Sequence, residues 1–390
     1  KDFQFLVFGD PQPYNKTELE YFDKGFTQEA KSVDGISFGI TLGEIVGDDL
    51  SLHAEYLKVM KKVEKPWYAV LGNHDMNFDV KDDQYSDESF EATFGPATYA
   101  FNYGDVHFIV MDNILYPDPR DNSGYWGGLR ADQLRFIEND LKHVSKDKLV
   151  VLFMHIPIFE EGGDSYRDEG RRKLLELIAP FKNSVSFSAH THYQCHTFFG
   201  KADGYNHDKL HHHHNIGTPS GDWYSGRLNK MGVPDSKMRD GTPKGYVIVN
   251  ISGSSYTSKY RVAGKDTNYQ MEVYNPKVVK KDQRTSAGIF VNFFMGSKND
   301  KVNYRIDNST WRAMQNVTAF DPSYMKELFN WDDSESLVIG KRPSNPELTN
   351  HLWRAGIPTN FSVGEHVIEI EATDIFGQVF TAKSIYRIEE

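Results

Sequence analysis

The chain has 390 residues, of which 44 are basic and 55 acidic, giving a formal net charge of −11. That length is enough for two domains, each with its own core. The acidic balance argues against broad nucleic-acid binding, which needs a basic surface facing the phosphates. It is compatible with a phosphate-bearing substrate, because bound divalent cations would reverse the charge locally.

Cys195 is the only cysteine in the sequence, which excludes an intrachain disulfide. No apolar run reaches the length of about 18 residues that a membrane span needs, so we expect none. The chain opens on an apolar run at residues 3–8 without an initiator Met. From this we expect a removed leader and an exported bacterial protein, periplasmic or extracellular. The sequence leaves the oligomeric state open.

The first part of the chain alternates short apolar runs with amphipathic stretches. The runs predict strands at residues 3–8, 36–42, 67–71, 106–111, 149–154 and 185–188. The amphipathic stretches predict helices at residues 17–31, 52–63, 130–144 and 171–178. Alternating strands and helices indicate an α/β layered core. Residues 193–243 predict long loops, and we expect the four histidines at 211–214 to form a solvated loop rather than a lining of the functional cleft.

The pattern changes in the C-terminal third. Residues 245–252 and 255–262 predict a hairpin, which we assign to the edge of the first sheet. Beyond residue 274 helical periodicity nearly vanishes, and short strands remain at 288–294, 301–306 and 365–372. The last of these alternates polar and apolar residues and continues into a partner strand at 379–385. We therefore predict a first domain at 1–274 and an all-β sandwich domain at 275–390.

Side chains that can bind metals follow five of the predicted strands. They are Asp10, Gln12, Glu44, Asn73, His155, His190 and His192, and His74 lies next to Asn73. Ligands of α/β folds collect beyond the carboxyl ends of the strands, so these loops are expected to converge. Oxygen and imidazole donors suit two divalent ions such as Mn, Fe or Zn. Taken singly, Asp10 is more simply a helix cap and His155 a packed core histidine, but five such strand ends rarely coincide by chance.

Sequence position also suggests how these residues share the ions. Two cations about 3.5–4 Å apart need a bridging carboxylate, and Glu44 fits because its strand lies between the other two that carry loops. His190 and His192 are two residues apart, and on an extended chain both rings would point to one side. Each imidazole could then bind a different ion.

The order of these motifs resembles the calcineurin-like metallophosphoesterase superfamily. The chain has D-x-Q at Asp10, G-E at Glu44, G-N-H-D at Asn73, H-I-P at His155 and A-H-T-H at His190. The usual order in that family is D-x-H, G-D-x-x-D, G-N-H-[DE], an isolated His and G-H-x-H. The resemblance covers residues 3–262 and implies a four-layer αββα metallophosphoesterase sandwich, followed here by an all-β, Ig-like sandwich domain.

The resemblance also implies a role for each residue. One ion would be bound by Asp10, Gln12 and His192, the other by Asn73, His155 and His190, with Glu44 bridging the two. His74 would contact the phosphoryl oxygen or protonate the leaving group, and Asp48 would orient its ring.

Three positions depart from the family pattern. Gln12 stands where His is usual, Glu44 where Asp is usual, and Ala189 where Gly is usual. A neutral amide is a weak ligand and a longer bridge alters the geometry. These departures raise the alternative of one loosely held ion or reduced activity.

The leading hypothesis is hydrolysis of a phosphoester, mono- or diester, by a hydroxide that two metal ions activate. Trp126 and Trp223 lie in Gly-rich loops, where their rings would either stack on the substrate or pack on the core. The alternative function is a catalytically weak or inactive metal-binding scaffold, whose β-sandwich serves as a binding or adhesion module.

Overall fold

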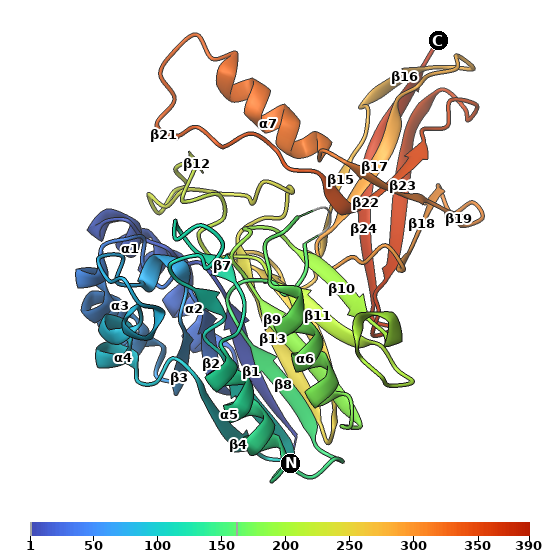
Figure 1. Cartoon of the computed structure of the whole chain (residues 1–390). Coiled ribbons are helices and arrows are strands. Elements are labelled where there is room, and N and C mark those ends of the chain that lie inside the picture. Colours follow the sequence, from blue (N-terminus) through green and yellow to red (C-terminus); the bar gives the residue numbers. More distant parts are fainter. Residues whose placement is uncertain (1, 161–162) are drawn as a thin grey trace.

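A five-stranded sheet contains the N-terminal strands, in the order β14-β13-β1-β2-β3. Strands β1 (Phe3–Phe8), β2 (Ile36–Leu42) and β3 (Trp67–Val70) are parallel, while β13 (Gly245–Ser252) and β14 (Ser255–Val262) are added antiparallel at the β1 edge. The computed structural model describes residues 2–160 and 163–390 (Figure 1). The predicted hairpin is therefore confirmed, and it extends the first sheet as expected.

A six-stranded sheet packs against the first, in the order β10-β11-β9-β8-β5-β4. Its strands are β4 (Tyr99–Tyr103), β5 (Val106–Val110), β8 (Leu149–Phe153), β9 (Asn183–Ser188), β10 (Cys195–Phe199) and β11 (His211–Asn215). The four inner strands are parallel. All four histidines at 211–214 are buried in β11, so the solvated loop expected there is wrong.

Aromatic side chains fill the space between the two sheets. Phe5 stacks on Phe38 with ring centroids 5.1 Å apart, and it meets Phe108 edge-on at 5.6 Å. Because successive side chains of a strand point to opposite faces, the other residues of these strands face the helices. Phe8 of β1, for example, contacts Phe22 with centroids 5.8 Å apart.

Helices cover the outer face of each sheet. The first is covered by α1 (Lys16–Phe22), α2 (Gln28–Ser32), α3 (His53–Met60) and α4 (Glu88–Phe94), and the second by α5 (Ala131–Leu141) and α6 (Asp168–Ile178) (Figure 1). The single helix expected at 17–31 is divided by a π-helical turn at Asp23–Thr27. The layers follow the order αββα, as the resemblance implied.

Two further sheets form a β-sandwich in the C-terminal region. One contains β15 (Met271–Tyr274), β17 (Gly288–Phe293), β22 (Thr349–Gly356) and β20 (Gln315–Ala319). The other contains β16 (Val278–Lys280), β24 (Val379–Glu389), β23 (Gly364–Thr373), β18 (Lys301–Ile306) and β19 (Arg312–Ala313). Buried residues such as Trp353 and Ile368 form the core between them. Since β15 precedes residue 275 and belongs to this sandwich, the division into 1–274 and 275–390 stays a prediction.

One helix interrupts the all-β region. Helix α7 (Pro322–Asp332) begins with Asp321 as N-cap, whose carboxylate accepts from Tyr324 N at 2.7 Å, and Pro322 occupies the first turn. These start signals are in the sequence, but the surrounding strand pattern concealed them. The chain beyond α7 reaches the first part of the molecule, where β21 (Gly340–Lys341) pairs with β12 (Gly226–Arg227) (Figure 1).

Within residues 2–160 and 163–390, no helix is both long enough and apolar enough to cross a membrane.

Candidate metal centre

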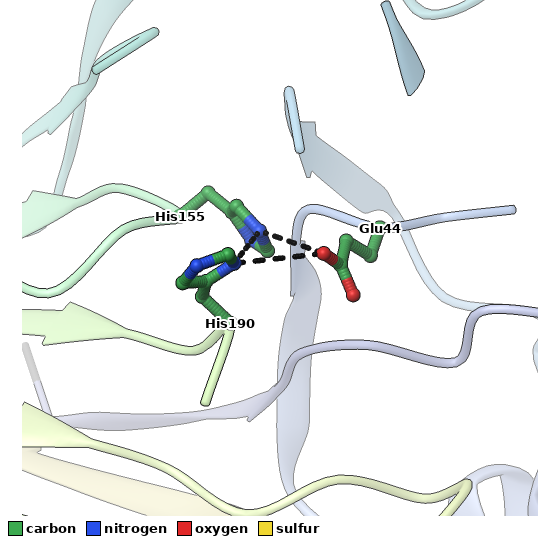
Figure 2. Close-up of side chains that lie close together, drawn as sticks. All are labelled: Glu44, His155 and His190. Atoms are coloured by element: carbon green, nitrogen blue, oxygen red, sulfur yellow. Dashed lines mark hydrogen bonds and ion pairs between the residues drawn. The ribbon is translucent and has the colours of Figure 1, made fainter. Parts of the chain in front are cut away.

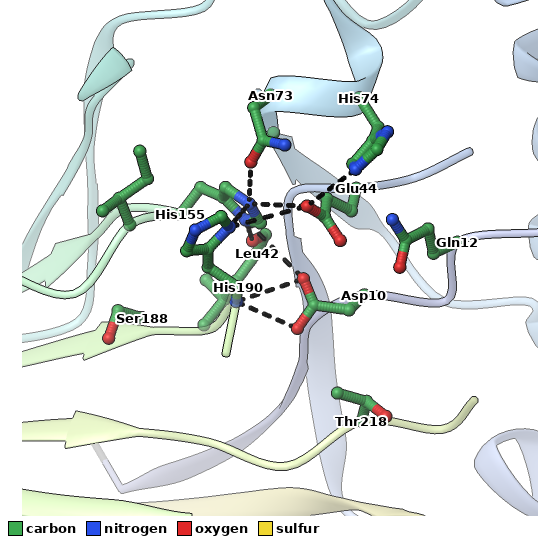
Figure 3. A network of polar contacts seen from close by, with 12 residues as sticks. Asp10, Gln12, Leu42, Glu44, Asn73, His74, His155, Ser188, His190 and Thr218 are labelled. Atoms are coloured by element: carbon green, nitrogen blue, oxygen red, sulfur yellow. Dashed lines mark hydrogen bonds and ion pairs between the residues drawn. The ribbon is translucent and has the colours of Figure 1, made fainter. Parts of the chain in front are cut away.

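The loops that follow the carboxyl ends of the parallel strands meet at one place. They bring together two groups of ligand-type side chains, Glu44 with His155 and His190, and Glu44 with Asp10 and His192. Within each group the candidate ligand atoms lie within 4.8 Å of one another. Glu44 belongs to both groups, as a bridging carboxylate must. Figure 3 shows that Asp10, Glu44, Asn73, His155 and His190 come from loops of both central sheets.

The Glu44 carboxylate lies among imidazole nitrogens. Its Oε1 is 3.4 Å from Nε2 of His155 and 3.5 Å from Nδ1 of His190 (Figure 2). Its Oε2 is 3.6 Å from Nε2 of His192. Asn73 adds a carbonyl oxygen at 2.9 Å from Nε2 of His155. The two carboxylate oxygens therefore face different sets of nitrogen donors.

Several of these side chains extend from backbone in the left-handed region. The φ angles are 52° at Asp10, 37° at Gln12, 48° at Glu44, 74° at His190 and 54° at His192. The extended conformation expected at His190 and His192 is therefore wrong. Both rings still reach Glu44, because the loop turns between them. Such conformations are costly for residues other than glycine and cluster at functional sites.

Tight contact between loops explains one of the glycines. A Cβ at Gly72 would lie 1.9 Å from the backbone nitrogen of Glu44, so only glycine allows the Asn73 loop to approach the Glu44 loop.

The side chains of Asp10 and Glu44 are both buried and lie close together. Burial, together with the negative charge of Glu44, raises the pKa of Asp10 well above its usual range. Burial also acts to raise the pKa of Glu44, but contacts with His155, His190 and His192 hold it well below its usual range. Positive charge at this point would satisfy both carboxylates.

Hydrogen bonds fix which ring nitrogens carry lone pairs. His155 Nδ1 lies 2.7 Å from the carbonyl oxygen of Leu42, and His192 Nδ1 lies 3.0 Å from that of Gly221. A carbonyl oxygen only accepts, so both Nδ1 atoms carry a proton, and Nε2 is the ring nitrogen through which each imidazole can bind a metal ion. Within the described residues, His192 Nε2 is buried without a hydrogen-bond partner.

This donor set fits a pair of divalent cations. Imidazole nitrogens surround the Glu44 carboxylate, and the amide oxygen of Asn73 lies beside them. Nitrogen and oxygen donors in this mixture suit Mn, Fe or Zn.

His74 and Asp48 form a hydrogen-bonded pair beside the candidate ligands. Nδ1 of His74 lies 2.6 Å from Oδ1 of Asp48, while its Nε2 lies 3.7 Å from Oε1 of Glu44. The Asp48 carboxylate therefore accepts a hydrogen bond from Nδ1 of His74, and this contact orients Nε2 toward the centre.

Asp75 is the last residue of the G-N-H-D motif, and no role is predicted for it from the motif alone. Its buried carboxylate accepts from the backbone nitrogens of Ile45, Val46 and Gly72 at 2.9–3.2 Å, and it contacts His53 Nε2 at 3.1 Å. It thereby ties the loop of Asn73 and His74 to the loop of Glu44. The motif includes this residue, but its role could not be predicted, because most of its hydrogen-bond partners lie 22–30 residues away in the sequence.

Gln12 contacts two aromatic side chains. Its Oε1 accepts from Trp223 Nε1 at 2.5 Å, and its Nε2 donates to Tyr14 Oη at 3.2 Å. Because an indole N–H can only donate, the Gln12 carbonyl must face Trp223. One lone pair of that carbonyl is thus used, and the second is left for an ion.

Trp223 also packs against a candidate ligand. Its ring lies 4.4 Å from that of His192. The predicted substrate-stacking residue therefore forms a wall of the centre, and its inner face is already covered.

Trp126 has different surroundings. Its ring lies under the Arg120 guanidinium, 4.1 Å away, and its Nε1 donates to the Asp164 carbonyl at 2.8 Å. Its neighbour Tyr125 lies closer to the ligands, with its ring 6.0 Å from that of His190. Burial and the Glu44 carboxylate raise the pKa of Tyr125 to about 12, so its hydroxyl stays protonated.

Two further contributors were missed by the sequence reasoning. Tyr14 has its ring 6.0 Å from that of His74. Asn113 accepts from the backbone nitrogens of His155 and Ile156 at 3.2 and 3.1 Å and so fixes the His155 loop. A tyrosine after D-x-Q and an asparagine after a strand are too common to be identified without the fold.

Comparison with protein families gave two matches. The model described as calcineurin-like phosphoesterase matches residues 3–194, and the model described as C terminal of calcineurin-like phosphoesterase matches residues 213–380. A search of curated proteins found no match.

Several solved structures are similar to the chain. A purple acid phosphatase from yellow lupin (Lupinus luteus) seeds has 15% identity and a TM-score of 0.47, with 67% of this chain and 52% of that one covered. A dimetal phosphatase from Danio rerio has 13% identity and a TM-score of 0.44, with 67% and 96% covered. GAP50, the anchor in the inner membrane complex of Plasmodium, has 14% identity and a TM-score of 0.41, with 68% and 85% covered. The chain thus spans about half the length of the lupin protein.

Proposed function

Because the chain belongs to the calcineurin-like phosphoesterase family, we propose that it hydrolyses phosphoesters with two divalent metal ions. The observation that carries this proposal is the pair of ligand groups that share the Glu44 carboxylate. Asp10, Gln12 and His192 would hold one ion with Glu44, and Asn73, His155 and His190 would hold the other.

When bound, the two ions supply a water acidic enough to act as nucleophile near neutral pH, and positive charge for the phosphoryl oxygens. The chain's own residues do the rest. Asp75 and Asn113 keep the ligand loops in place through their backbone hydrogen bonds. Tyr14 and Tyr125 border the centre, and their neutral hydroxyls can donate to a substrate oxygen.

His74 has the position of the general acid. Its Nδ1 proton is committed to Asp48, so a proton on Nε2 faces the centre and can pass to the leaving oxygen. The Asp48 side chain is 58% exposed, which leaves this pair open to solvent for reprotonation.

We further propose that the C-terminal region supports the Trp223 wall. Lys341 Nζ donates to the Trp223 carbonyl at 3.3 Å, and Ser344 N donates to Asp222 Oδ2 at 2.7 Å. These contacts hold a loop in which Trp223 and Tyr224 both have positive φ, 46° and 57°. A C-terminal region that holds the Trp223 loop in place accounts for these contacts better than an adhesion module that acts independently.

The test is hydrolysis by metal-free protein reconstituted with Mn²⁺, Zn²⁺ or Fe²⁺. Suitable probes are p-nitrophenyl phosphate and bis-p-nitrophenyl phosphate, which separate monoesterase from diesterase activity. We expect turnover of at least one ester that a chelator abolishes. His190→Gln should lose it, whereas His143→Gln, the same change at an exposed histidine, should retain it. Bound metal without hydrolysis of either ester would instead support the inactive scaffold.

A further inference from the structure

The histidine strand β11 contains a hydrogen-bonded chain that the proposed mechanism does not use. On one face of the second sheet, side chains of β9 and β11 alternate as Ser184, His211, Ser186, His213, Ser188 and Asn215, all of them buried. Each successive contact is 2.7–2.9 Å long. We call these six residues the serine–histidine chain.

The end of the serine–histidine chain fixes its direction. One polar atom of the Asn215 amide lies 2.8 Å from the carbonyl oxygen of Tyr193, so that atom must be the nitrogen. The amide oxygen therefore faces Ser188, and the Ser188 hydroxyl must donate to it at 2.9 Å.

Every earlier member is then determined. Since Ser188 donates to Asn215, it accepts from His213 Nε2, and the bare Nδ1 of His213 accepts from Ser186. The same steps assign an Nε2 proton to His211. Burial lowers the pKa of both histidines to about 3, so each ring carries a single ring-nitrogen proton. Tyr205 Oη, 3.0 Å from Ser184 Oγ, supplies the first donor.

The serine–histidine chain ends at the loop of the candidate ligands. The Asn215 amide also donates to Thr191 Oγ1 at 2.6 Å. Thr191 lies between His190 and His192, both of which have left-handed φ angles. A conformation of this kind persists only where its surroundings hold it, and one amide here holds both Thr191 and Tyr193.

We propose that the serine–histidine chain positions the loop that carries His190 and His192, with Asn215 as the positioning residue that contacts it. This inference rests on the proposed function, since the loop matters as a source of metal ligands. Hydrogen bonds that all run in one direction polarise one another, so each serine strengthens the next contact toward Asn215. Residues that orient metal ligands in this way typically change metal affinity by about 10- to 100-fold when they are replaced.

The first test is the protonation of the rings in the metal-free protein. Nitrogen–proton correlation NMR distinguishes a protonated from a bare ring nitrogen. We expect His211 and His213 to be neutral and protonated on Nε2. In Ser186→Ala the acceptor for His211 Nε2 is lost, so both forms of that ring should appear, while His213 keeps its Nε2 proton because Ser188 still donates to Asn215. A wild-type His213 protonated on Nδ1 would overturn the assignment.

The second test is calorimetric titration with Mn²⁺ alone. Ser186→Ala should bind Mn²⁺ about tenfold more weakly than wild type, and Ser186→Thr, which restores a hydroxyl, should recover most of that affinity. Asn215→Asp keeps the acceptor for Ser188 but loses the donors to Thr191 and Tyr193, and should be weaker still. Ser258→Ala is the matched control, because among the described residues that buried hydroxyl has no partner. Unchanged affinity in both Ser186→Ala and Asn215→Asp would overturn the inference.

The two proposals fail in different ways. Wild-type protein that binds Mn²⁺ and hydrolyses esters, with Ser186→Ala unaffected, removes only the positioning role. Protein that binds Mn²⁺ without hydrolysis, but more weakly in Ser186→Ala, removes the enzymatic function and supports the positioning role.

Discussion

At the scale of single residues, the candidate centre is built from strained positions. Five of the seven proposed ligands have φ between 37° and 74°. Each such residue costs about 1–3 kcal/mol, which the fold must offset by fixed contacts. Asp75 and Asn215 supply such contacts with several hydrogen bonds each.

Replacing the proposed general acid should affect esters according to their leaving group. His74→Gln removes the proton donor, so kcat for an alkyl phosphoester should fall by about 10²- to 10⁴-fold. The p-nitrophenolate leaving group needs little protonation, and its rate should change far less. Steady-state kinetics on the two esters measures this difference.

Asp48→Asn provides the control for that experiment. It keeps the contact with His74 but removes the charge, so its effect should follow the same leaving-group order and be smaller. Equal loss on both esters in both variants would remove the acid role.

The residue types at the strand ends could be predicted from the sequence, because each motif is local. Tyr14, Tyr125 and Asn113 could not, since what makes them part of the centre is contact with residues far along the chain. The backbone conformation of His190 and His192 was also missed, because sequence spacing does not reveal a left-handed turn.

At the scale of elements, β11 shows how a polar strand can be buried. His211 and His213 are satisfied by the serines of β9, and on the other face His212 contacts Tyr256 Oη at 2.7 Å and His196 Nδ1 at 2.7 Å. Polar runs usually lie in solvent. This one is buried because a neutral imidazole whose two nitrogens are both hydrogen-bonded loses little free energy when it leaves water. The serines that satisfy it lie on a different strand.

The strand should make the protein sensitive to acid. Burial lowers the pKa of His196, His211 and His213 to about 3, and that of His212 well below the usual value. The unfolded chain takes up protons below pH ~6.5 while these folded rings do not, so stability is lost as pH falls. Between pH 7.5 and 5.5 each such ring should lower the free energy of unfolding by about 1.4 kcal/mol.

Urea unfolding of metal-free protein at both pH values measures this loss. His212→Gln removes one titrating ring from the face opposite the serine–histidine chain. Its stability should fall less than that of wild type by about 1.4 kcal/mol. An equal fall in the two proteins would show that His212 is not held neutral.

The Trp223 loop gives a second prediction at this scale. Trp223→Phe keeps a ring against His192 but removes the N–H that holds the Gln12 carbonyl. Affinity for the more weakly held of two Mn²⁺ ions should fall about tenfold. Trp126→Phe makes the same change away from the ligands, and its titration should match wild type; equal effects of the two variants would contradict the assigned wall.

At the scale of the whole molecule, loops of the two central sheets converge on one small volume, and an arm of the C-terminal region contacts the Trp223 loop beside it. The parallel strands of both central sheets direct their carboxyl ends to the same edge, which is why motifs from residues 10 to 192 meet there. The alternation of strands and helices made the layered core predictable. The arm that runs from α7 to β21 was not, because its docking depends on only a few contacts with the Trp223 loop.

The central claim is that Glu44 joins two metal ions in one centre. Elemental analysis of protein dialysed against excess Mn²⁺ and then freed of loose ions tests it most directly, with Glu44→Gln as comparison. We predict two ions per wild-type chain and at most one in Glu44→Gln. A wild-type chain that retains no ion, or a Glu44→Gln chain that still retains two, would contradict the account.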